Sequence, residues 1–331
     1  MTDIVTFGET MIRLSPPDHL RIEQTASLNL SAGGAELTVA AGVARLGLKS
    51  AWVSRLPDNP LGRLIANKGR EFDVDVSHVL WVDDERIGLY FVEYGAEPRP
   101  TRVYYDRADS AFAHIQPGMV DWATVFRNVR LFHVGGITPA LSASAFQAQK
   151  EAMIAAQKAG CLVSYDVNYR AALWSIEDAR KAQLPLMEYV DMLITSLPDQ
   201  PNITELLSGL EGNDPAEVAR QVAEKFGFKA VLVTMRKSLS AKRASLTSLA
   251  FAENKIYTDR LYEVETVDSL GGGDACVAGF LTGFLEGDVQ HAVRLGNAFS
   301  TLTQTSPTDM PWPTRAEAEA LIVDGESSMR R

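Results

Sequence analysis

Short apolar runs of four to six residues alternate with longer helical segments along most of this chain, and that alternation restricts its fold more than any other feature. The apolar runs predict strands at residues 4–7, 50–54, 130–135, 161–166, 192–195 and 230–234. Helical periodicity separates them at residues 37–46, 61–72, 143–159 and 215–226. A β-α-β rhythm of this kind predicts an α/β fold, in which a mostly parallel central sheet carries helices on both faces.

A different pattern interrupts this rhythm between residues 79 and 105. Strand-like alternation at 79–82, 88–94 and 101–105 is separated by turn signals at 83–86 and 95–100. The pattern predicts a small antiparallel sheet inserted into the α/β fold. Such an insertion is a candidate for a lid that closes over a ligand.

The strand pattern also predicts which edge of the central sheet binds ligands. In open parallel sheets, ligands bind at the carboxyl ends of the strands. Gly8, Asp166, Thr195 and Thr234 fall at or directly after the ends of four predicted strands. We therefore expect the functional residues to gather near these positions.

Three consecutive glycines, Gly271 to Gly273, precede Asp274 and an almost wholly apolar helical segment. Glycine lets the backbone turn tightly and approach a ligand closely. The N-terminus of the following helix offers unpaired N–H groups and a positive dipole end, which suit a phosphate or a developing oxyanion. In the first turn of that helix, the carboxylate of Asp274 suits a general base acting on an alcohol beside a phosphoryl group. The alternative is an N-capping aspartate after a flexible turn.

Overall composition excludes several classes of function. The 331 residues are 46% apolar and 22% charged, as in ordinary soluble globular proteins, and a net charge of −10 argues against a nucleic-acid-binding surface. Cys161 and Cys276 lie in apolar runs, and the five histidines show no metal-ligand spacing. No apolar stretch approaches the length of a membrane span and no signal sequence precedes the first predicted strand, so we expect a cytoplasmic protein.

Three segments carry motifs that occur together in a known family. The first is Asp268 to Asp274, an Asp-x-x-Gly-x-Gly-Asp motif, and the second is residues 30–40, which contain the Gly33-Gly34 turn. The third is residues 163–170, an Asp-x-Asn-x-Arg segment followed by Leu173-Trp174. Together these segments resemble the ribokinase-like (phosphofructokinase-B type) sugar kinases over nearly the whole chain. Within that family, the Gly-Gly-Gly-Asp turn, Asn168-Tyr169-Arg170 and residues 135–142 are similar to those of 2-keto-3-deoxygluconate kinases.

The resemblance implies a ribokinase-like three-layer sandwich with a mostly parallel central sheet and a small inserted β-sheet lid. It implies one kinase domain over residues 1–325, with lid segments at about 10–32 and 79–110, and a frayed tail at 326–331. An exposed lid sheet in this family often pairs with a second subunit, so we expect a homo-oligomer.

The reaction implied by the resemblance is transfer of the γ-phosphoryl group of ATP to 2-keto-3-deoxygluconate, which yields its 6-phosphate. Asp274 would be the general base, and Gly271, Gly272 and Gly273 would form the anion hole. A sugar acid carries a carboxylate, which calls for arginine and tyrosine donors. The substrate-binding residues implied in this way are Gly34, Tyr90, Tyr105, Arg107, Arg170 and Asp274.

On the nucleotide side, the resemblance implies a set of residues around the phosphates and the adenine of ATP. These are Asn168, Thr234, Arg236, Gly271, Gly273 and Asn297. Mg²⁺ is expected with ATP, since it usually binds through phosphates and water. Many family members also hold a monovalent cation such as K⁺ beside the anion turn, ligated partly at the position of Asp268.

Two segments depart from the family pattern. Where the family usually has Asn-x-x-Glu, which organises magnesium, this chain has Ser196-Leu197-Pro198-Asp199, so the role falls to Asp199 or to Glu205. Where the family often has a glycine-rich turn, this chain has residues 235–240, a larger and more basic turn that would meet the phosphates through Arg236 or Lys237.

The sequence leaves several alternatives open. A neighbouring specificity, such as a fructokinase, a ribokinase or a deoxygalactonate kinase, would preserve the same motifs. A non-catalytic sugar-binding relative would preserve the fold, because fold alone does not determine function. The preferred configuration at C4 of the substrate is not encoded in any of these motifs.

Overall fold

The strands predicted from apolar runs lie together in one large sheet in the computed structural model, which describes residues 2–197, 214–240 and 242–324. Within these residues the strand order is β13-β12-β11-β10-β9-β8-β1-β4-β5, and β14 pairs with β12. The strands are β1 (Ile4–Phe7), β4 (Ser50–Pro57), β5 (Val79–Val82), β8 (Leu131–Gly135), β9 (Leu162–Asp166), β10 (Met192–Leu197), β11 (Ala230–Ser240), β12 (Arg243–Ala252), β13 (Lys255–Thr258) and β14 (Tyr262–Glu265).

Parallel pairing dominates this sheet, as the β-α-β rhythm predicts. Every neighbouring pair from β11 to β5 is parallel. The hairpins that β12 forms with β11, β13 and β14 are antiparallel. The carboxyl ends of the parallel strands therefore meet at one edge, where Gly135 lies opposite Asp166 and Ser196 lies opposite Thr234.

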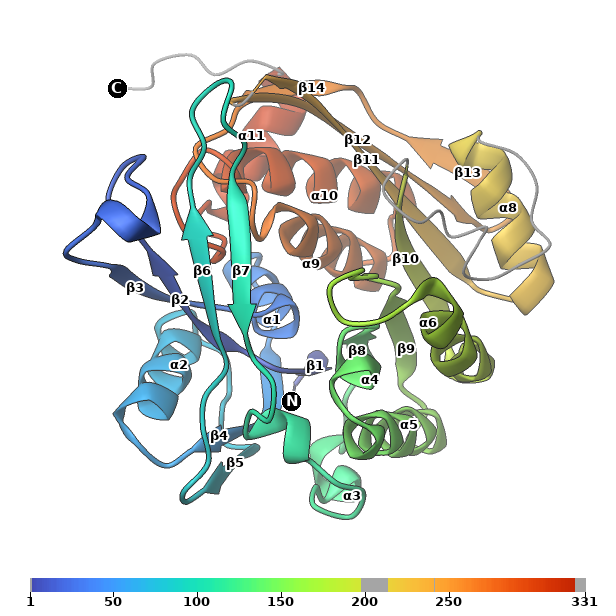
Figure 1. Ribbon diagram of the computed structural model, residues 1–331. Helices are drawn as coiled ribbons and strands as arrows, with labels where there is room; N and C mark the ends of the chain where they lie inside the picture. The colour runs from blue at the N-terminus through green and yellow to red at the C-terminus, as the bar shows by residue number, and fades with distance from the viewer. Residues whose placement is uncertain (1, 198–213, 241, 325–331) are drawn as a thin grey trace.

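Helices cover both faces of the large sheet (Figure 1), because alternate residues of each strand point to opposite faces. Val5 and Phe7 pack in the apolar layer of α5 (Ala143–Lys158) and α8 (Pro215–Phe226). Ile4 packs in the opposite layer, which contains α1 (Ala35–Arg45), α9 (Gly272–Leu285) and α10 (Val289–Thr303). Other helical segments are α2 (Pro60–Glu71), α3 (Trp122–Val125), α4 (Thr138–Leu141), α6 (Ile176–Gln183), α11 (Arg315–Asp324), η1 (Ile22–Gln24), η2 (Phe112–His114) and η3 (Leu184–Tyr189). Among the described residues, no helix is both long and apolar enough to cross a membrane.

Helices α9 and α10 approach each other closely because glycines lie at their contact. A Cβ atom on Gly279 would lie 2.7 Å from the Cα of Gly296, and one on Gly283 would lie 2.5 Å from the Cα of Ala292. Small residues at these positions let the two backbones touch. This packing fixes the axis of α9, and hence the direction of its N-terminus at the ligand-binding edge of the sheet.

A second, smaller sheet stands to one side of the large sheet (Figure 1). Its strand order is β3-β2-β6-β7, from β3 (Asn29–Gly33), β2 (Met11–Ser15), β6 (Leu89–Glu93) and β7 (Arg102–Asp106). The β2–β3 and β6–β7 pairs are antiparallel hairpins, whereas β2 and β6 pair in parallel. We call this sheet the lid sheet.

The prediction that residues 79–82 form a lid strand is wrong. This strand, β5, pairs in parallel with β4 and extends the large sheet. It completes a β4-α2-β5 unit, in which Val79 is buried in the same apolar cluster as Ile65 and Phe72. A run of four alternating residues does not identify its partner strand, and here tertiary packing decides the pairing.

The predicted turn at residues 235–240 is also wrong. Strand β11 continues to Ser240, because β12 supplies an antiparallel partner along its whole length apart from an irregularity near Ser238 and Ser240. Arg236 and Lys237 therefore lie on an exposed strand extension. The predicted magnesium residue Asp199, its alternative Glu205 and the tail 326–331 lie outside the described residues.

Candidate active site

The glycine turn forms the N-terminus of α9, as the sequence predicts. Gly271 is the N-cap residue and has a left-handed backbone, with φ of 77°. A Cβ atom there would lie 2.0 Å from the carbonyl oxygen of Asp309, so a side chain has no room. The hydroxyl of Ser300 donates to the carbonyl of Gly272 at 2.7 Å. The turn is thus held from two sides, and the N–H groups of the first helical turn are directed as an anion site requires.

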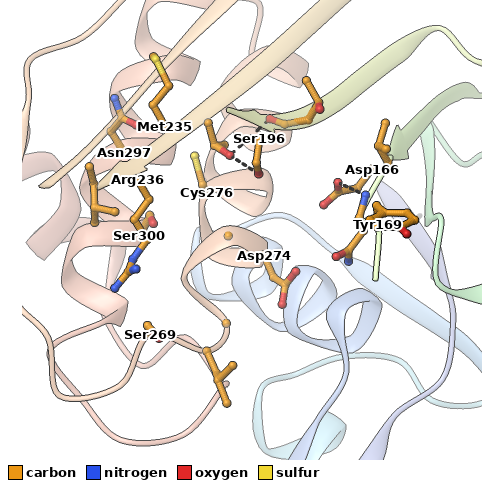
Figure 2. Close-up of a pocket in the computed structure, with 18 of the residues that line it drawn as sticks. Asp166, Tyr169, Ser196, Met235, Arg236, Ser269, Asp274, Cys276, Asn297 and Ser300 are labelled. Carbon is orange, nitrogen blue, oxygen red and sulfur yellow. Dashed lines mark hydrogen bonds between the residues drawn. The ribbon is translucent and has the colours of Figure 1, made fainter. Parts of the chain in front are cut away.

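Asp274 lies in the first turn of α9 and projects into a cavity whose opposite wall carries Asp166 and Tyr169 (Figure 2). Burial raises the pKa of Asp274 to about 7, the negative charge of Asp166 adds to the effect, and Arg170 opposes it. Burial also raises the pKa of Asp166, to about 6. A carboxyl group that titrates near neutrality suits a general base.

A small cavity of about 90 Å³ lies between the lid sheet and the ligand-binding edge of the large sheet. The structure brings all six predicted substrate residues together here. The lining includes Glu9, Gly34, Glu36, Tyr90, Tyr105, Arg107, Arg170, Leu270, Gly271, Asp274 and Asp309.

Arg107 is oriented by neighbours on the lid side of this small cavity. Its side chain is 9% exposed, and its Nε donates to Glu9 Oε2 at 2.9 Å. Its guanidinium lies 5.9 Å from the ring of Tyr105, which stacks on Tyr90 with ring centroids 6.0 Å apart. Arg107 is therefore a buried, paired group and not a solvated surface charge. Arg170, in contrast, is exposed, and it donates to the carbonyl of its neighbour Tyr169.

Glu36 is a buried carboxyl group in the small cavity that sequence reasoning missed. Glu36 is 3% exposed, and its Oε1 is buried without a hydrogen-bond partner among the described residues. Burial raises its pKa to about 8, with further contributions from Asp274 and Asp166. Glu36 is therefore protonated at neutral pH. Gly8 makes room for it, since a Cβ atom on Gly8 would lie 2.1 Å from Glu36 Oε2.

The cavity into which Asp274 projects, with Asp166 and Tyr169 on its opposite wall, is the larger of the two, at about 310 Å³ (Figure 2). The six predicted nucleotide residues all line it, namely Asn168, Thr234, Arg236, Gly271, Gly273 and Asn297. The Thr234 hydroxyl is 2.8 Å from that of Ser196, and Asn297 Nδ2 donates to Asp259 Oδ2 at 3.1 Å. Gly272, the first residue of α9, is buried within the glycine turn.

The two cavities meet at the glycine turn. Four residues line both of them, and they are Arg170, Leu270, Gly271 and Asp274. A group bound in the larger cavity and a group bound in the smaller one would thus face each other across Asp274. This arrangement suits transfer of a group between two ligands, with a base at the point of transfer.

The predicted cation role of Asp268 disagrees with the structure. Asp268 Oδ1 accepts the N–H of Leu270 at 3.0 Å, and its Oδ2 accepts from Arg13 at 2.5 Å and from Tyr94 at 2.6 Å. Its oxygens are engaged by donors, one of them cationic. Within the described ranges, no group of three or more His, Cys, Asp or Glu side chains could hold a metal ion.

Besides Glu36, sequence reasoning missed three residues that shape the site. Glu9 follows Gly8 at the end of the first strand, so its position at a strand end was the available signal. Arg13 and Asp309 belong to no motif and come together only in the fold.

Comparison with known proteins agrees with this geometry. The family model for pfkB family carbohydrate kinases matches residues 1–315. A 2-dehydro-3-deoxygalactonokinase of Haloferax volcanii is 38% identical over 330 residues, which are 99% of each chain. A 2-dehydro-3-deoxygluconokinase of Bacillus subtilis is 31% identical over 327 residues, covering 97% of this chain and 95% of the relative. The crystal structure of 2-dehydro-3-deoxygluconokinase from Thermotoga maritima has a TM-score of 0.93 and 39% identity, covering 97% of this chain and 98% of that one. The chain belongs to the pfkB family of carbohydrate kinases, and it is an ATP-dependent sugar kinase.

Proposed function

We propose that this kinase phosphorylates the terminal hydroxyl of 2-keto-3-deoxygluconate (2-dehydro-3-deoxygluconate) and yields its 6-phosphate. The observation that carries the proposal is that two arginines line the same small cavity as the proposed base. Arg107 and Arg170 both line this cavity beside Asp274. A neutral sugar needs no such charge, whereas a sugar acid presents a carboxylate that guanidinium groups bind well.

Two acidic groups of the small cavity, Glu9 and Glu36, do not compete with an anionic ligand for Arg170. Glu9 is paired with Arg107, and Glu36 is protonated at neutral pH because its pKa is about 8. The positive charge of Arg170 acts instead on Asp274 and Asp166, whose pKa values it lowers. Protonated Glu36 can also donate a hydrogen bond to a hydroxyl or keto oxygen of the ligand.

In the proposed reaction, ATP lies in the larger cavity and the sugar acid in the smaller one. The Asp274 carboxylate accepts the proton of the terminal hydroxyl of the sugar acid. The hydroxyl oxygen bonds to the γ-phosphorus of ATP, and the bond between the γ-phosphorus and the β-phosphate oxygen breaks. The N–H groups at the start of α9 stabilise the charge on the transferring group. Positioning and electrostatics of this kind supply most of the catalysis in phosphoryl transfer.

Magnesium enters the proposal with ATP, whose phosphate charge it neutralises. Among the described residues, Asp166 is a carboxyl group that fits a water-mediated contact, since it lines the larger cavity on the wall that faces Asp274. One of its oxygens already accepts the N–H of Asn168 at 3.0 Å. A water-mediated contact of this kind is compatible with the usual preference of Mg²⁺ for phosphates and water.

The C4 epimer of the substrate, 2-keto-3-deoxygalactonate, is a second candidate. It is favoured by the relative from Haloferax volcanii, which is a deoxygalactonokinase with 38% identity. The arginine pair would bind the carboxylate of either epimer. The two acids therefore differ only in their contacts at C4.

The test is an ATP-consumption assay with 2-keto-3-deoxygluconate, its C4 epimer and fructose side by side, in the presence of Mg²⁺. We expect turnover of at least one keto-deoxy acid and little turnover of fructose. Comparable turnover of fructose would discard the carboxylate argument while leaving the kinase activity intact. Absence of turnover on both acids, with folded protein, would refute the substrate assignment.

A pair of arginine variants tests the carboxylate contact directly. Arg107→Gln should raise the KM for the acid by about 10- to 100-fold, the usual effect of losing a hydrogen bond to a charged group. Arg102→Gln is the matched control, because Arg102 is an exposed residue of the neighbouring strand β7. An unchanged KM for Arg107→Gln would contradict the contact.

A further inference from the structure

A buried arginine from the lid sheet lies directly behind the anion turn. Arg13, on β2, is 1% exposed. Its Nη2 is 2.5 Å from Asp268 Oδ2 and also donates to the hydroxyl of Tyr94, while its Nη1 donates to Asp309. Its Nε is 3.3 Å from the hydroxyl of Ser15. All three guanidinium nitrogens are therefore engaged, which fixes the position of the charge.

The cluster is balanced by two carboxyl groups, Asp268 and Asp309. Burial alone would lower the pKa of the Arg13 guanidinium, but Asp309 and Asp268 raise it above its ordinary value. The charge is thus permanent. Removing one partner of such a buried ion pair leaves the other uncompensated, which is strongly unfavourable.

Both carboxyl residues act on the anion turn. Asp268 Oδ1 accepts the N–H of Leu270 at 3.0 Å, which fixes the start of the turn. The carbonyl oxygen of Asp309 lies against Gly271, where a Cβ atom would approach it to 2.0 Å. Asp309 Oδ2 also accepts from the hydroxyl of Tyr90, a residue of the small cavity, at 2.9 Å. Arg13 therefore connects the lid sheet to both sides of the turn.

A monovalent cation, which the family resemblance predicts at Asp268, does not fit these contacts. A cation needs oxygen lone pairs, but the Oδ2 of Asp268 accepts from Arg13, from Tyr94 at 2.6 Å and from the N–H of Thr308 at 3.2 Å. The Oδ1 accepts from Leu270. A guanidinium within hydrogen-bond distance of the same carboxylate would also repel the cation.

We propose that Arg13 takes the place of this cation, so that the kinase does not depend on K⁺. Arg13 is a positioning residue, because it touches neither cavity's ligand and acts through Asp268 and Asp309 on the turn that receives the phosphoryl charge. The inference rests on the kinase activity of the chain and not on which sugar acid it accepts.

The first experiment uses the unmodified protein. Turnover of ATP with the accepted keto-deoxy acid is measured in chlorides of K⁺, Na⁺ and tetramethylammonium at equal ionic strength, and the melting temperature is measured in the same salts. We expect kcat to agree within about twofold and the melting temperatures of K⁺ and tetramethylammonium samples to coincide. Saturable stimulation by K⁺ of about tenfold or more, or a saturable rise of the melting temperature with K⁺, would overturn the inference. The melting data decide the matter even if neither acid is a substrate, so the two proposals fail separately.

The second experiment uses Arg13→Met, Arg13→Lys and a control, Arg55→Met. Arg55 is a comparable buried arginine, 8% exposed, that pairs with Glu85 and lies away from the turn. We expect Arg13→Met to lower kcat by about 100-fold, as misplacement of a catalytic group does, with partial recovery in added guanidinium. The kcat of Arg13→Lys should lie between those of the parent and Arg13→Met. Arg55→Met should lose stability but retain kcat.

Outcomes that contradict a positioning role are specific. The role is refuted if Arg13→Met retains kcat within about threefold of the parent, or if Arg55→Met loses as much kcat as Arg13→Met. If Arg13→Met does not fold, the salt series on the unmodified protein remains decisive.

Discussion

The protonation state of Glu36 yields a quantitative prediction about stability. Glu36 is buried in the small cavity, and its pKa rises from the ordinary 4.5 to about 8 in the folded protein. Between these values the folded chain holds a proton at Glu36 that the unfolded chain has released. Stability contributed by this group is thus complete below pH 4.5 and is lost as the pH rises toward 8. The substitution that removes this dependence with little change of shape is Glu36→Gln.

The magnitude follows from the difference in proton binding. Each pH unit within that window lowers the free energy of unfolding by about 1.4 kcal/mol. Two units, from pH 5.5 to 7.5, therefore lower it by about 3 kcal/mol. Asp166 and Asp274 also have raised pKa values, but they are present in both proteins and largely cancel in the comparison.

The assay is urea denaturation of both proteins at pH 5.5, 6.5 and 7.5, followed by fluorescence of the buried Trp52 and Trp122. The stability of Glu36→Gln relative to the parent should increase by about 3 kcal/mol across the series. Glu71→Gln is the matched control, since Glu71 is exposed at the end of α2 and its pair with Lys68 should contribute little. A difference between Glu36→Gln and the parent that stays constant within about 0.5 kcal/mol would show that Glu36 is ionised, and it would refute the reasoning.

Further predictions concern the base, the turn and the helix contact. Because only unprotonated Asp274 can accept a proton, kcat should rise with pH through the Asp274 pKa of about 7, and a flat pH profile from 5.5 to 8.5 would contradict this. Asp274→Asn should lower kcat by about 10²- to 10⁴-fold, while calorimetry still detects ATP binding. Gly271→Ala should cost about 1–3 kcal/mol in urea denaturation because of its φ of 77°, whereas Gly273→Ala, whose Cβ would meet no atom within 4 Å, should not. Gly279→Ala should cost about 1–3 kcal/mol because its Cβ would lie 2.7 Å from the Cα of Gly296, and an unchanged unfolding midpoint would show that α9 and α10 can separate freely.

Elements with strong local signals were predictable from the sequence. The order of apolar runs and helices gives the parallel sheet, since right-handed β-α-β units leave few alternative topologies. The glycine turn and Asp274 were predictable as the start of α9, because the required backbone and the apolar helix lie in one continuous segment. The residues named for each cavity were also brought together in the fold.

Features that depend on distant partners were not predictable. Strand β5 has the same alternation as a lid strand, and its pairing with β4 depends on packing against Ile65 and Phe72. The extension of β11 depends on its antiparallel pairing with β12, and no turn signal beside β12 predicted that pairing. Glu36 lies in a helical segment where a charged residue usually faces solvent, so its burial could not be inferred from period alone.

The contact between Arg13 and Asp309 joins residues 296 positions apart in the chain. Closing a loop of that length costs conformational entropy before the contact can stabilise anything. During synthesis the anion turn therefore lacks its contact with Asp309 until the segment around residue 309 has left the ribosome. A nascent chain with a finished sheet and a finished α9 would still lack both the Asp309 carbonyl that lies against Gly271 and the Asp309 carboxylate that pairs with Arg13.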